Sequence, residues 1–164
     1  MIQPELEQLI APNMMDFMIP ADNVANVIDS HTLSNGLLVL SQVNYSLIPV
    51  LSVKSKLIGL ISMPMIIKSV MTVESIEMNR LDEMKVSDVM LHQPVRVTRD
   101  CHLEEVLHYL IDHNFICVVE DDDTFIGIIT RKKVLQRLTY LLHETANPQA
   151  IAKLIALLQP KVPA

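Results

Sequence analysis

Dense apolar runs alternate with polar turns along the chain and predict two β-hairpins. Residues 47–51 and 115–119 are apolar, too short for a helix and rich in β-branched side chains, which is typical of a buried strand. A polar turn follows each run and leads to a second apolar run at residues 57–62 or 125–130. Each pair of runs is therefore predicted to form a hairpin.

Helices are predicted on both sides of each hairpin. Before it, a short extended segment (residues 24–28 or 95–98) leads through a polar turn into a stretch whose apolar residues recur every three or four positions. For the second of these helices, the predicted N-cap is Thr98 or Asp100. A last helix in each half is predicted to begin near Pro64 and near Arg131.

The two halves of the chain repeat one another. Asp16-Phe17-Met18 returns as Asp88-Val89-Met90 at an offset of 72, and Gly59-Leu60-Ile61-Ser62 returns as Gly127-Ile128-Ile129-Thr130 at an offset of 68. Between these motifs, three leucines return at an offset of 70: Leu33, Leu37 and Leu40 as Leu103, Leu107 and Leu110. The offset falls in small steps, as short loop deletions would produce, so the recurrence indicates a duplication.

The duplication predicts an α+β fold made of tandem β-α-β-β-α repeats. One repeat is too small to bury both faces of its sheet, so the two are expected to share a core. The predicted organisation is repeat 1 at 13–71, a charged and helical linker at 72–85, repeat 2 at 86–139 and a helical extension at 140–164. Within that extension, residues 150–158 form an apolar helical stretch.

Composition narrows the classes of function. The 164-residue chain carries a formal net charge of −6, which disfavours DNA or an anionic membrane as the main partner. Cys101 and Cys117 form no CxxC pair, and the N-terminal sequence has no secretory signal. The longest strongly apolar stretch, residues 57–67, is about half a membrane span. A soluble cytoplasmic protein is expected.

The duplicated motifs resemble those of the paired CBS, or Bateman, modules. The resemblance covers residues 13–139 and rests on Ile48-Pro49-Val50, on the two glycine-containing strands and on their ordered recurrence. The segments at 18–27, 37–50 and 130–132 are more narrowly similar to the stand-alone cyclic-di-AMP-binding CBS proteins of Firmicutes. This resemblance implies a homodimer, cyclic di-AMP as ligand and the (p)ppGpp synthetase/hydrolase Rel as partner.

Site chemistry differs between the two repeats. Paired CBS modules usually hold a ribose with an Asp three residues after the Ser or Thr that ends the strand, but Met65 and Lys133 occupy those positions here. Their presence counts against an ordinary AMP or ATP site. In repeat 2, Thr130 is followed by Arg131 and Lys132 at a predicted helix N-terminus, where two cations and free amides favour a phosphate over a merely solvated role.

The resemblance places the other half of the ligand site in repeat 1. Ala25 is small enough for a base to approach the backbone, and Tyr45 could stack on a purine or serve as an ordinary residue at the edge of the core. Where Asn23 stands, the family often has a lysine. The implied contacts in this repeat are Asn23, Val24, Ala25, Tyr45, Ser46 and Ile48.

Two alternatives remain open at this point. One is another adenine-nucleotide sensor for AMP or ATP, and the other is a ligand-independent interaction module that uses the C-terminal tail. No enzyme is expected, because no nucleophile–base pair or metal motif is present. The six histidines are scattered, and the acidic run 120–123 lies where a solvated hairpin turn is predicted, so no metal cofactor is expected.

Overall fold

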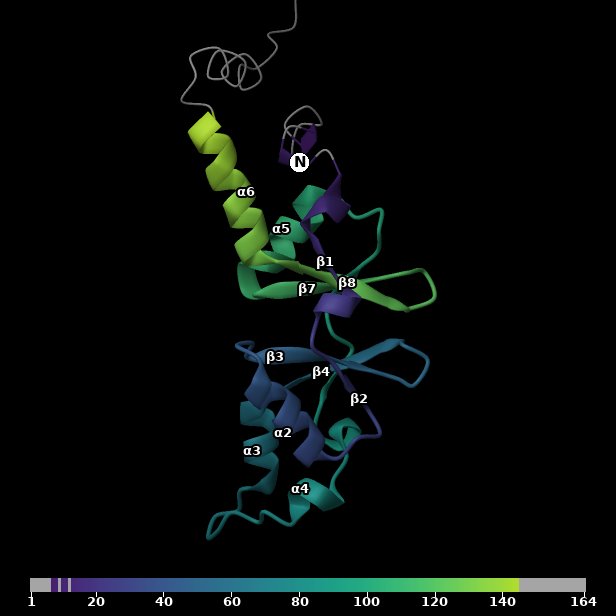
Figure 1. Ribbon diagram of the computed structural model, residues 1–164, viewed down its shortest axis with the longest axis vertical. Coiled ribbons are helices and arrows are strands. Elements are labelled where there is room, and N and C mark those ends of the chain that lie inside the picture. Colours follow the sequence, from purple (N-terminus) through teal and green to yellow (C-terminus); the bar gives the residue numbers. More distant parts are fainter. Residues whose placement is uncertain (1–6, 9, 12, 145–164) are drawn as a thin grey trace, which may run out of the picture. The chain divides into compact units, whose positions relative to one another are not determined.

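The described strands form two four-stranded sheets in the computed structural model, with orders β1-β8-β7-β6 and β2-β3-β4-β5 (Figure 1). The structure describes residues 7, 8, 10, 11 and 13–144. The strands are β1 (Met18–Pro20), β2 (Val27–Ile28), β3 (Leu47–Leu51), β4 (Leu57–Ser62), β5 (Leu91–His92), β6 (Arg96–Val97), β7 (Phe115–Val119) and β8 (Phe125–Thr130). The four hairpin strands β3, β4, β7 and β8 have the predicted bounds.

Five helices accompany these strands in the described part of the chain. They are α2 (Leu33–Gln42), α3 (Met63–Val70), α4 (Arg80–Glu83), α5 (Leu103–Asp112) and α6 (Arg131–Glu144). Together with the two sheets they confirm the predicted mixed α+β class. None of the described helices is both long and apolar enough to cross a bilayer.

Contacts divide the chain into two compact units. Unit 1 comprises residues 1–18, 100–116 and 129–164, and unit 2 comprises residues 19–99 and 117–128. The core of unit 2 is a cluster of buried aliphatic residues from β2, α2, β3, β4, α3 and the segment that follows α3. Its members are Val27, Leu33, Leu40, Ile48, Val50, Ile61, Ile66, Val70, Leu81, Val86 and Met90.

The duplication is preserved in strand register. β2 runs parallel to β3 with Val27 opposite Val50, and β6 runs parallel to β7 with Val97 opposite Val118. The residues of the first pair return in the second at the offsets of 70 and 68 found in the sequence. The repeated Asp-x-Met motifs also correspond, since each begins within a 3₁₀ turn (Met14–Phe17 or Val86–Asp88) that leads towards β1 or β5.

Each sheet takes its outermost strand from the other half of the sequence. β1 lies near the start of repeat 1 but belongs to the sheet of β6, β7 and β8, while β5 lies near the start of repeat 2 but belongs to the sheet of β2, β3 and β4. The sequence reasoning missed both strands, because two or three residues are too few to show a period. Gly59 makes room for β5: a Cβ atom at this position would lie 2.8 Å from the carbonyl oxygen of Leu91.

Two expectations about helices are wrong. The segment 72–85 is predicted to be helical, but only Arg80–Glu83 forms a helix. The segment begins with a turn in which the Thr72 hydroxyl accepts a hydrogen bond from the Ser75 amide. Such side-chain bonds compete with helix formation. Helix α5 begins at Leu103, so its N-cap residue is His102 and not Thr98 or Asp100. The His102 side chain forms no capping hydrogen bond with the helix.

An acceptor from elsewhere in unit 1 serves the first turn of α5. The carboxylate of Glu7 accepts a hydrogen bond of 2.7 Å from the Leu103 amide, a group that has no partner within the helix. At the other end of the chain, α6 continues to Glu144, so the predicted extension begins inside this helix. The predicted apolar helix at 150–158 lies outside the described residues.

Candidate functional site

A groove of about 590 Å³ lies where α5 ends and α6 begins in unit 1. Cavities that hold small ligands in proteins range from about 300 to 1,000 Å³. Arg131, Leu135 and Thr139 follow one another at intervals of four along α6, and so share one face of the helix. The groove is lined by Asn114, Arg131, Lys132, Leu135, Gln136 and Thr139.

The guanidinium of Arg131 is fixed by the end of α5. Its Nε donates to the Leu110 carbonyl at 2.8 Å, and its Nη2 donates to the carbonyls of Ile111 and His113 at 3.2 and 3.0 Å. The Arg131 amide donates to the Asn114 carbonyl at 2.8 Å. Arg131 thus binds carbonyls that the end of a helix leaves without partners, and is not merely solvated. The third nitrogen of the Arg131 guanidinium, Nη1, has no hydrogen-bond partner among the described residues.

The neighbouring residues complete a cationic helix start. The Thr130 hydroxyl accepts a hydrogen bond from the Lys133 amide at 3.2 Å, as an N-cap does. Lys132 is exposed and lines the groove without an ion pair to any described residue. The first turn of α6 contains no acidic side chain. The chemistry of this groove therefore suits an anion with an apolar portion.

The repeat 1 residues lie in two segments of unit 2 that lead into neighbouring strands. Residues 23–25 precede β2 and residues 45–48 lead into β3, and β2 runs parallel to β3 with Val27 opposite Val50. Ala25 is partly buried against the core cluster, whereas Tyr45 is more than half exposed just before β3. A purine can reach the Tyr45 ring from solvent.

The other predicted contacts in unit 2 differ in accessibility. Asn23 and Ser46 are exposed. Val24 is buried, and its carbonyl accepts a hydrogen bond from the Asn26 side chain at 3.0 Å. Ile48 is only 1% exposed and belongs to the core cluster, so its side chain supports the site from behind.

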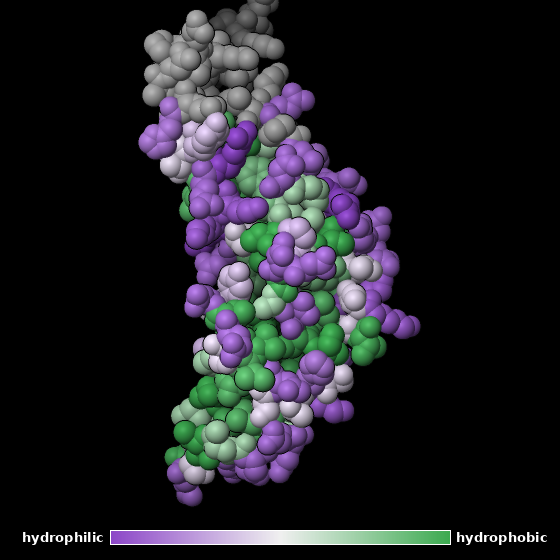
Figure 2. Space-filling model, viewed as in Figure 1, coloured by the Kyte–Doolittle hydropathy of each residue, from purple (hydrophilic) through white to green (hydrophobic). Residues whose placement is uncertain are grey.

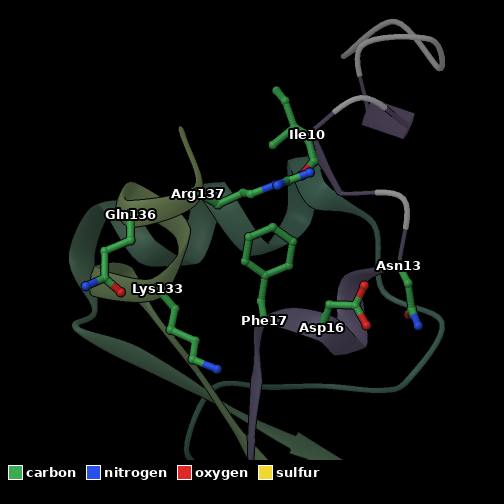
Figure 3. A pocket seen from close by; sticks show the side chains of 7 residues that line it. All are labelled: Ile10, Asn13, Asp16, Phe17, Lys133, Gln136 and Arg137. Atoms are coloured by element: carbon green, nitrogen blue, oxygen red, sulfur yellow. The ribbon is translucent and has the colours of Figure 1, made fainter. Parts of the chain in front are cut away.

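Lys133 lines a different cavity from Lys132. This second cavity, of about 350 Å³, lies between α6 and the segment before β1 (Figure 3). Phe17 lies between Lys133 and Asp16 in this view, and Arg137 donates to the Ile10 carbonyl at 3.3 Å. The two adjacent lysines of α6 therefore serve different surfaces, which makes each a control for the other.

Sequence reasoning missed the residues that complete the groove. Leu135 and Thr139 could have been found from the spacing of four that starts at Arg131. Asn114 could not, because its place beside Arg131 depends on how the end of α5 meets the start of α6.

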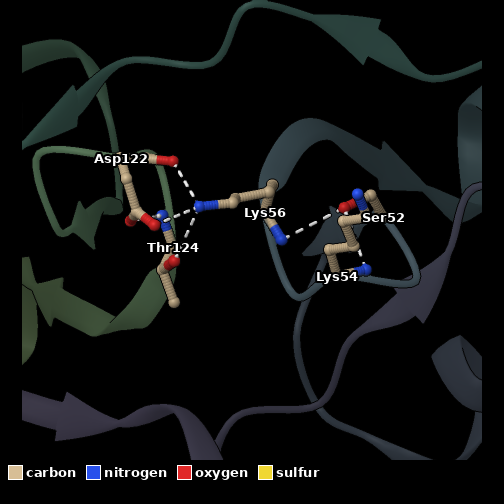
Figure 4. A network of polar contacts seen from close by, with 5 residues as sticks. All are labelled: Ser52, Lys54, Lys56, Asp122 and Thr124. Atoms are coloured by element: carbon tan, nitrogen blue, oxygen red, sulfur yellow. Dashed lines mark hydrogen bonds and ion pairs between the residues drawn. The ribbon is translucent and has the colours of Figure 1, made fainter.

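The acidic hairpin turn is exposed, as predicted, and its carboxylates are also ion-paired at the surface. Lys56 forms an ion pair with the Asp122 carboxylate, and its Nζ also donates to the Asp122 carbonyl at 2.6 Å and to the Thr124 hydroxyl at 3.0 Å (Figure 4). The hydrogen bond from Lys56 holds the pKa of Asp122 well below its usual range. Glu120 and Asp123 pair with Arg99 and Arg96 at 2.7 and 3.3 Å.

The turns of the two hairpins also pair through their backbones. The Leu57 amide donates to the Asp123 carbonyl at 3.0 Å, and the Phe125 amide donates to the Ser55 carbonyl at 2.9 Å. Ser55 and Asp123 both adopt positive φ, at 59° and 65°. The partners of one bond correspond to those of the other under the offset of 68, so the contact has the symmetry of the duplication.

The two cysteines are buried thiols. Burial raises the pKa of Cys117 to about 12, and burial together with the nearby Glu105 carboxylate raises that of Cys101 to about 11. A thiol nucleophile acts as the thiolate, which such pKa values make scarce at neutral pH. Within residues 7, 8, 10, 11 and 13–144, no three His, Cys, Asp or Glu side chains lie close enough together to hold a metal ion.

Comparisons with known proteins agree with the fold. A family model of the CBS domain matches residues 86–140. Cyclic di-AMP receptor B of Bacillus subtilis is 38% identical over 138 residues, which are 84% of this chain and 94% of the receptor. The CbpB protein of Listeria monocytogenes in complex with c-di-AMP is 41% identical with a TM-score of 0.74, covering 78% of this chain and 96% of that chain.

A second solved structure, of a CbpB in complex with c-di-AMP, has a TM-score of 0.78 at 25% identity. It covers 87% of this chain and 95% of that chain. The similarity thus extends over both halves of the duplication, beyond the part that the family model matches.

Proposed function

This chain belongs to the family of CBS-domain proteins that includes cyclic di-AMP receptor B of Bacillus subtilis, and from that membership we propose that it binds cyclic di-AMP. The observation that carries the proposal is the groove in unit 1, where Leu135 lies beside a fixed arginine and a lysine that has no ion pair within the described part of the chain. Cyclic di-AMP combines two phosphates with two purines, and the cations of this groove suit the phosphates.

The phosphates are proposed to bind at the start of α6. Arg131 offers Nη1, and its side chain loses little freedom on binding because three carbonyls already hold it. Lys132 adds a point charge, and Thr130 fixes the helix start from which both project. The carboxylate that would bind a ribose is replaced by Met65 and Lys133, which favours a cyclic dinucleotide over AMP or ATP.

The adenines are proposed to contact unit 2. Tyr45 stacks on or hydrogen-bonds to a base, Ala25 and Val24 present their backbone, and Asn23 and Ser46 supply exposed polar groups around them. Ile48 shapes this surface from the core. Each part of the proposal can be tested alone, since the two sets of residues lie in different units.

Calorimetric titration with cyclic di-AMP, AMP and ATP tests the ligand. Lys132→Ala is expected to weaken cyclic di-AMP binding by about tenfold or more, because a charge-assisted hydrogen bond contributes roughly 1.5–3 kcal/mol. Arg131→Ala should weaken it at least as much. Lys133→Ala removes the same charge from the same turn but lines the other cavity, so it serves as the control.

Three results would contradict the proposal. The first is tighter binding of AMP than of cyclic di-AMP, and the second is no binding of either ligand by the wild type. The third is equal affinity of the Lys132→Ala and Lys133→Ala variants for cyclic di-AMP. Thermal melts of the same variants show whether each one folds, which matters for Arg131 because it holds the end of α5.

The output of such a receptor is proposed to be binding to another protein. The resemblance implies a cytoplasmic homodimer that performs no chemistry and regulates the (p)ppGpp synthetase/hydrolase Rel when ligand is absent. A ligand controls such a complex only through different affinities for its free and bound states. Titration of purified Rel with the protein, with and without cyclic di-AMP, should show binding only without ligand; equal binding in both would refute the regulation.

A further inference from the structure

Two residues of the groove in unit 1 have free side-chain amides. Asn114 and Gln136 both line the groove and are exposed, and neither side chain forms a hydrogen bond within the described part of the chain. A carboxamide has donor hydrogens and an acceptor oxygen, so it can donate and accept at the same time. The groove therefore offers more than positive charge to a ligand.

The other side chains of this groove cannot both donate and accept. Arg131 and Lys132 are donors only, and Leu135 has no polar group in its side chain. The Thr139 hydroxyl already donates to the Leu135 carbonyl at 2.9 Å, within its own helix. Figure 2 shows mostly hydrophilic residues over the part of unit 1 where α6 lies in Figure 1. The two carboxamides are thus the side chains of the groove that match an edge with one donor and one acceptor.

Adenine and guanine differ on the edge that such a group contacts. On its N6/N7 edge adenine has a donor, the exocyclic amine, and an acceptor, N7, and an Asn or Gln carboxamide pairs with both. Guanine has two acceptors, O6 and N7, on the same edge, and an arginine fork pairs with those. A free carboxamide therefore favours adenine, whereas a free guanidinium fork favours guanine.

The end of α5 occupies the guanidinium fork of Arg131. Nε of Arg131 donates to the Leu110 carbonyl, and Nη2 donates to the carbonyls of Ile111 and His113. A single nitrogen, Nη1, is left without a partner among the described residues, so Arg131 cannot present two nitrogens to O6 and N7 of guanine. Lys132 has no planar fork and acts on a phosphate as a point charge.

Asn114 is better placed for a base than Gln136. Its backbone carbonyl accepts a hydrogen bond of 2.8 Å from the Arg131 amide, which fixes Asn114 beside the proposed phosphate contacts. Its side chain is shorter than that of Gln136, which also lines the second cavity of unit 1. A short side chain on a fixed backbone loses less conformational entropy when it binds a ligand.

We propose that the Asn114 carboxamide binds the N6/N7 edge of one adenine of the ligand and makes the groove select adenine over guanine. The inference rests on the proposed binding of cyclic di-AMP and names the residue that recognises the base. The Asn114 amide donates to N7, and its oxygen accepts from the exocyclic amine. Guanine would place O6 against that oxygen, and two acceptors without a hydrogen between them repel each other.

Calorimetric titration with cyclic di-AMP and cyclic di-GMP tests the selectivity. The wild type should bind cyclic di-AMP more tightly by about tenfold or more, because a bidentate pair of this kind discriminates between bases to that extent. Asn114→Ala should lose most of this preference by weakening cyclic di-AMP binding. Lys132→Ala should weaken the binding of both ligands alike, since a phosphate contact carries no information about the base.

A 7-deaza analogue of cyclic di-AMP isolates the Asn114 contact. The analogue lacks the N7 acceptors, so Asn114→Ala should cost less affinity for the analogue than for cyclic di-AMP. The second adenine loses its N7 with both proteins, and its contribution cancels when the two losses are compared. Thermal melts show whether the variant folds. Titration of the wild type with both ligands tests the contact without any substitution, and equal affinities there would overturn it.

Gln136→Ala separates the two carboxamides of the groove. The preference for cyclic di-AMP over cyclic di-GMP should remain in this variant. A preference that is lost in Gln136→Ala and kept in Asn114→Ala would assign the base contact to the wrong residue and overturn the inference.

Equal affinities of the wild type for cyclic di-AMP and cyclic di-GMP would refute the selectivity and leave the proposed ligand standing. An Asn114→Ala variant that loses the same affinity for cyclic di-AMP and for the 7-deaza analogue would also refute the contact. A wild type that binds neither cyclic dinucleotide would refute the proposed function together with this inference.

Discussion

Replacing Gly59 with alanine tests whether the close approach of β5 to β4 stabilises the protein. The added Cβ would lie 2.6 Å from the Met90 sulfur, 3.0 Å from the Met90 Cγ and 2.8 Å from the Leu91 carbonyl oxygen. The Met90 side chain can move, but the carbonyl belongs to a two-residue strand that pairs with Gly59 and Leu60. The strand must shift, and Met90, only 9% exposed, must leave its place in the core.

The magnitude follows from two opposing contributions. Overpacking of this kind costs about 1–3 kcal/mol, and lost burial of Met90 adds to that cost. Alanine restricts the unfolded chain more than glycine and returns roughly 0.4–1 kcal/mol. We expect a net destabilisation of about 2 kcal/mol, which lowers the Tm by about 4–8 °C in a chain of this size.

Gly36→Ala is the matched control for this experiment. Its Cβ would meet only side-chain atoms, the Ile66 Cδ1 at 3.3 Å and the Val86 Cγ2 at 3.4 Å. Because alanine is favoured over glycine in a helix by about 1 kcal/mol, the free energy of unfolding of this variant should lie within about 1 kcal/mol of the wild-type value. Urea denaturation measures both variants. Equal stability of Gly59→Ala and the wild type, or a larger loss for Gly36→Ala, would refute the reasoning.

Two further predictions concern polar contacts. Glu7→Ala should lower the free energy of unfolding by about 1 kcal/mol because the Leu103 amide loses its acceptor. Glu7→Gln keeps an acceptor oxygen and should keep most of the wild-type stability. Calorimetric melts that do not separate the two variants would contradict this. Lys56 lowers the pKa of Asp122 in the folded protein, so the Asp122 carboxylate stabilises the fold above its ordinary pKa, and this stabilisation is lost as the pH falls below that value. Lys56→Met should therefore make the free energy of unfolding less sensitive to acid. Urea unfolding at pH 7, 5 and 3 checks this, and parallel curves for the two proteins would disprove it.

The elements that could be predicted are those whose own residues determine their structure. The hairpin strands β3, β4, β7 and β8 are long apolar runs bounded by polar turns, and their ends were found correctly. The strands β1 and β5 are too short to show a pattern and exist because a sheet from the other half of the sequence accepts them. The linker looked helical by composition, but the Thr72 side chain stabilises a turn instead.

The candidate site shows the same division. The run from Thr130 to Lys132 could be singled out because cations at a helix start conflict with the helix dipole. That Arg131 binds three carbonyls at and just after the end of α5 could not be read from the sequence, since those carbonyls belong to residues about 20 positions away. The ion pairs of the acidic turn were missed for the same reason, because Lys56 lies 66 residues from Asp122.

The exchange of β1 and β5 makes the pair of repeats, rather than one repeat, the unit that can be inherited or excised intact. A fragment cut at the bounds of the matched CBS domain, residues 86–140, would keep β5 without its sheet and lose β1 from the edge of β8. An uncovered strand edge of this kind invites pairing with another chain. Separated halves of the protein should therefore find one another, and a chain with a strained connection between them could exchange halves with a neighbour as a domain-swapped dimer.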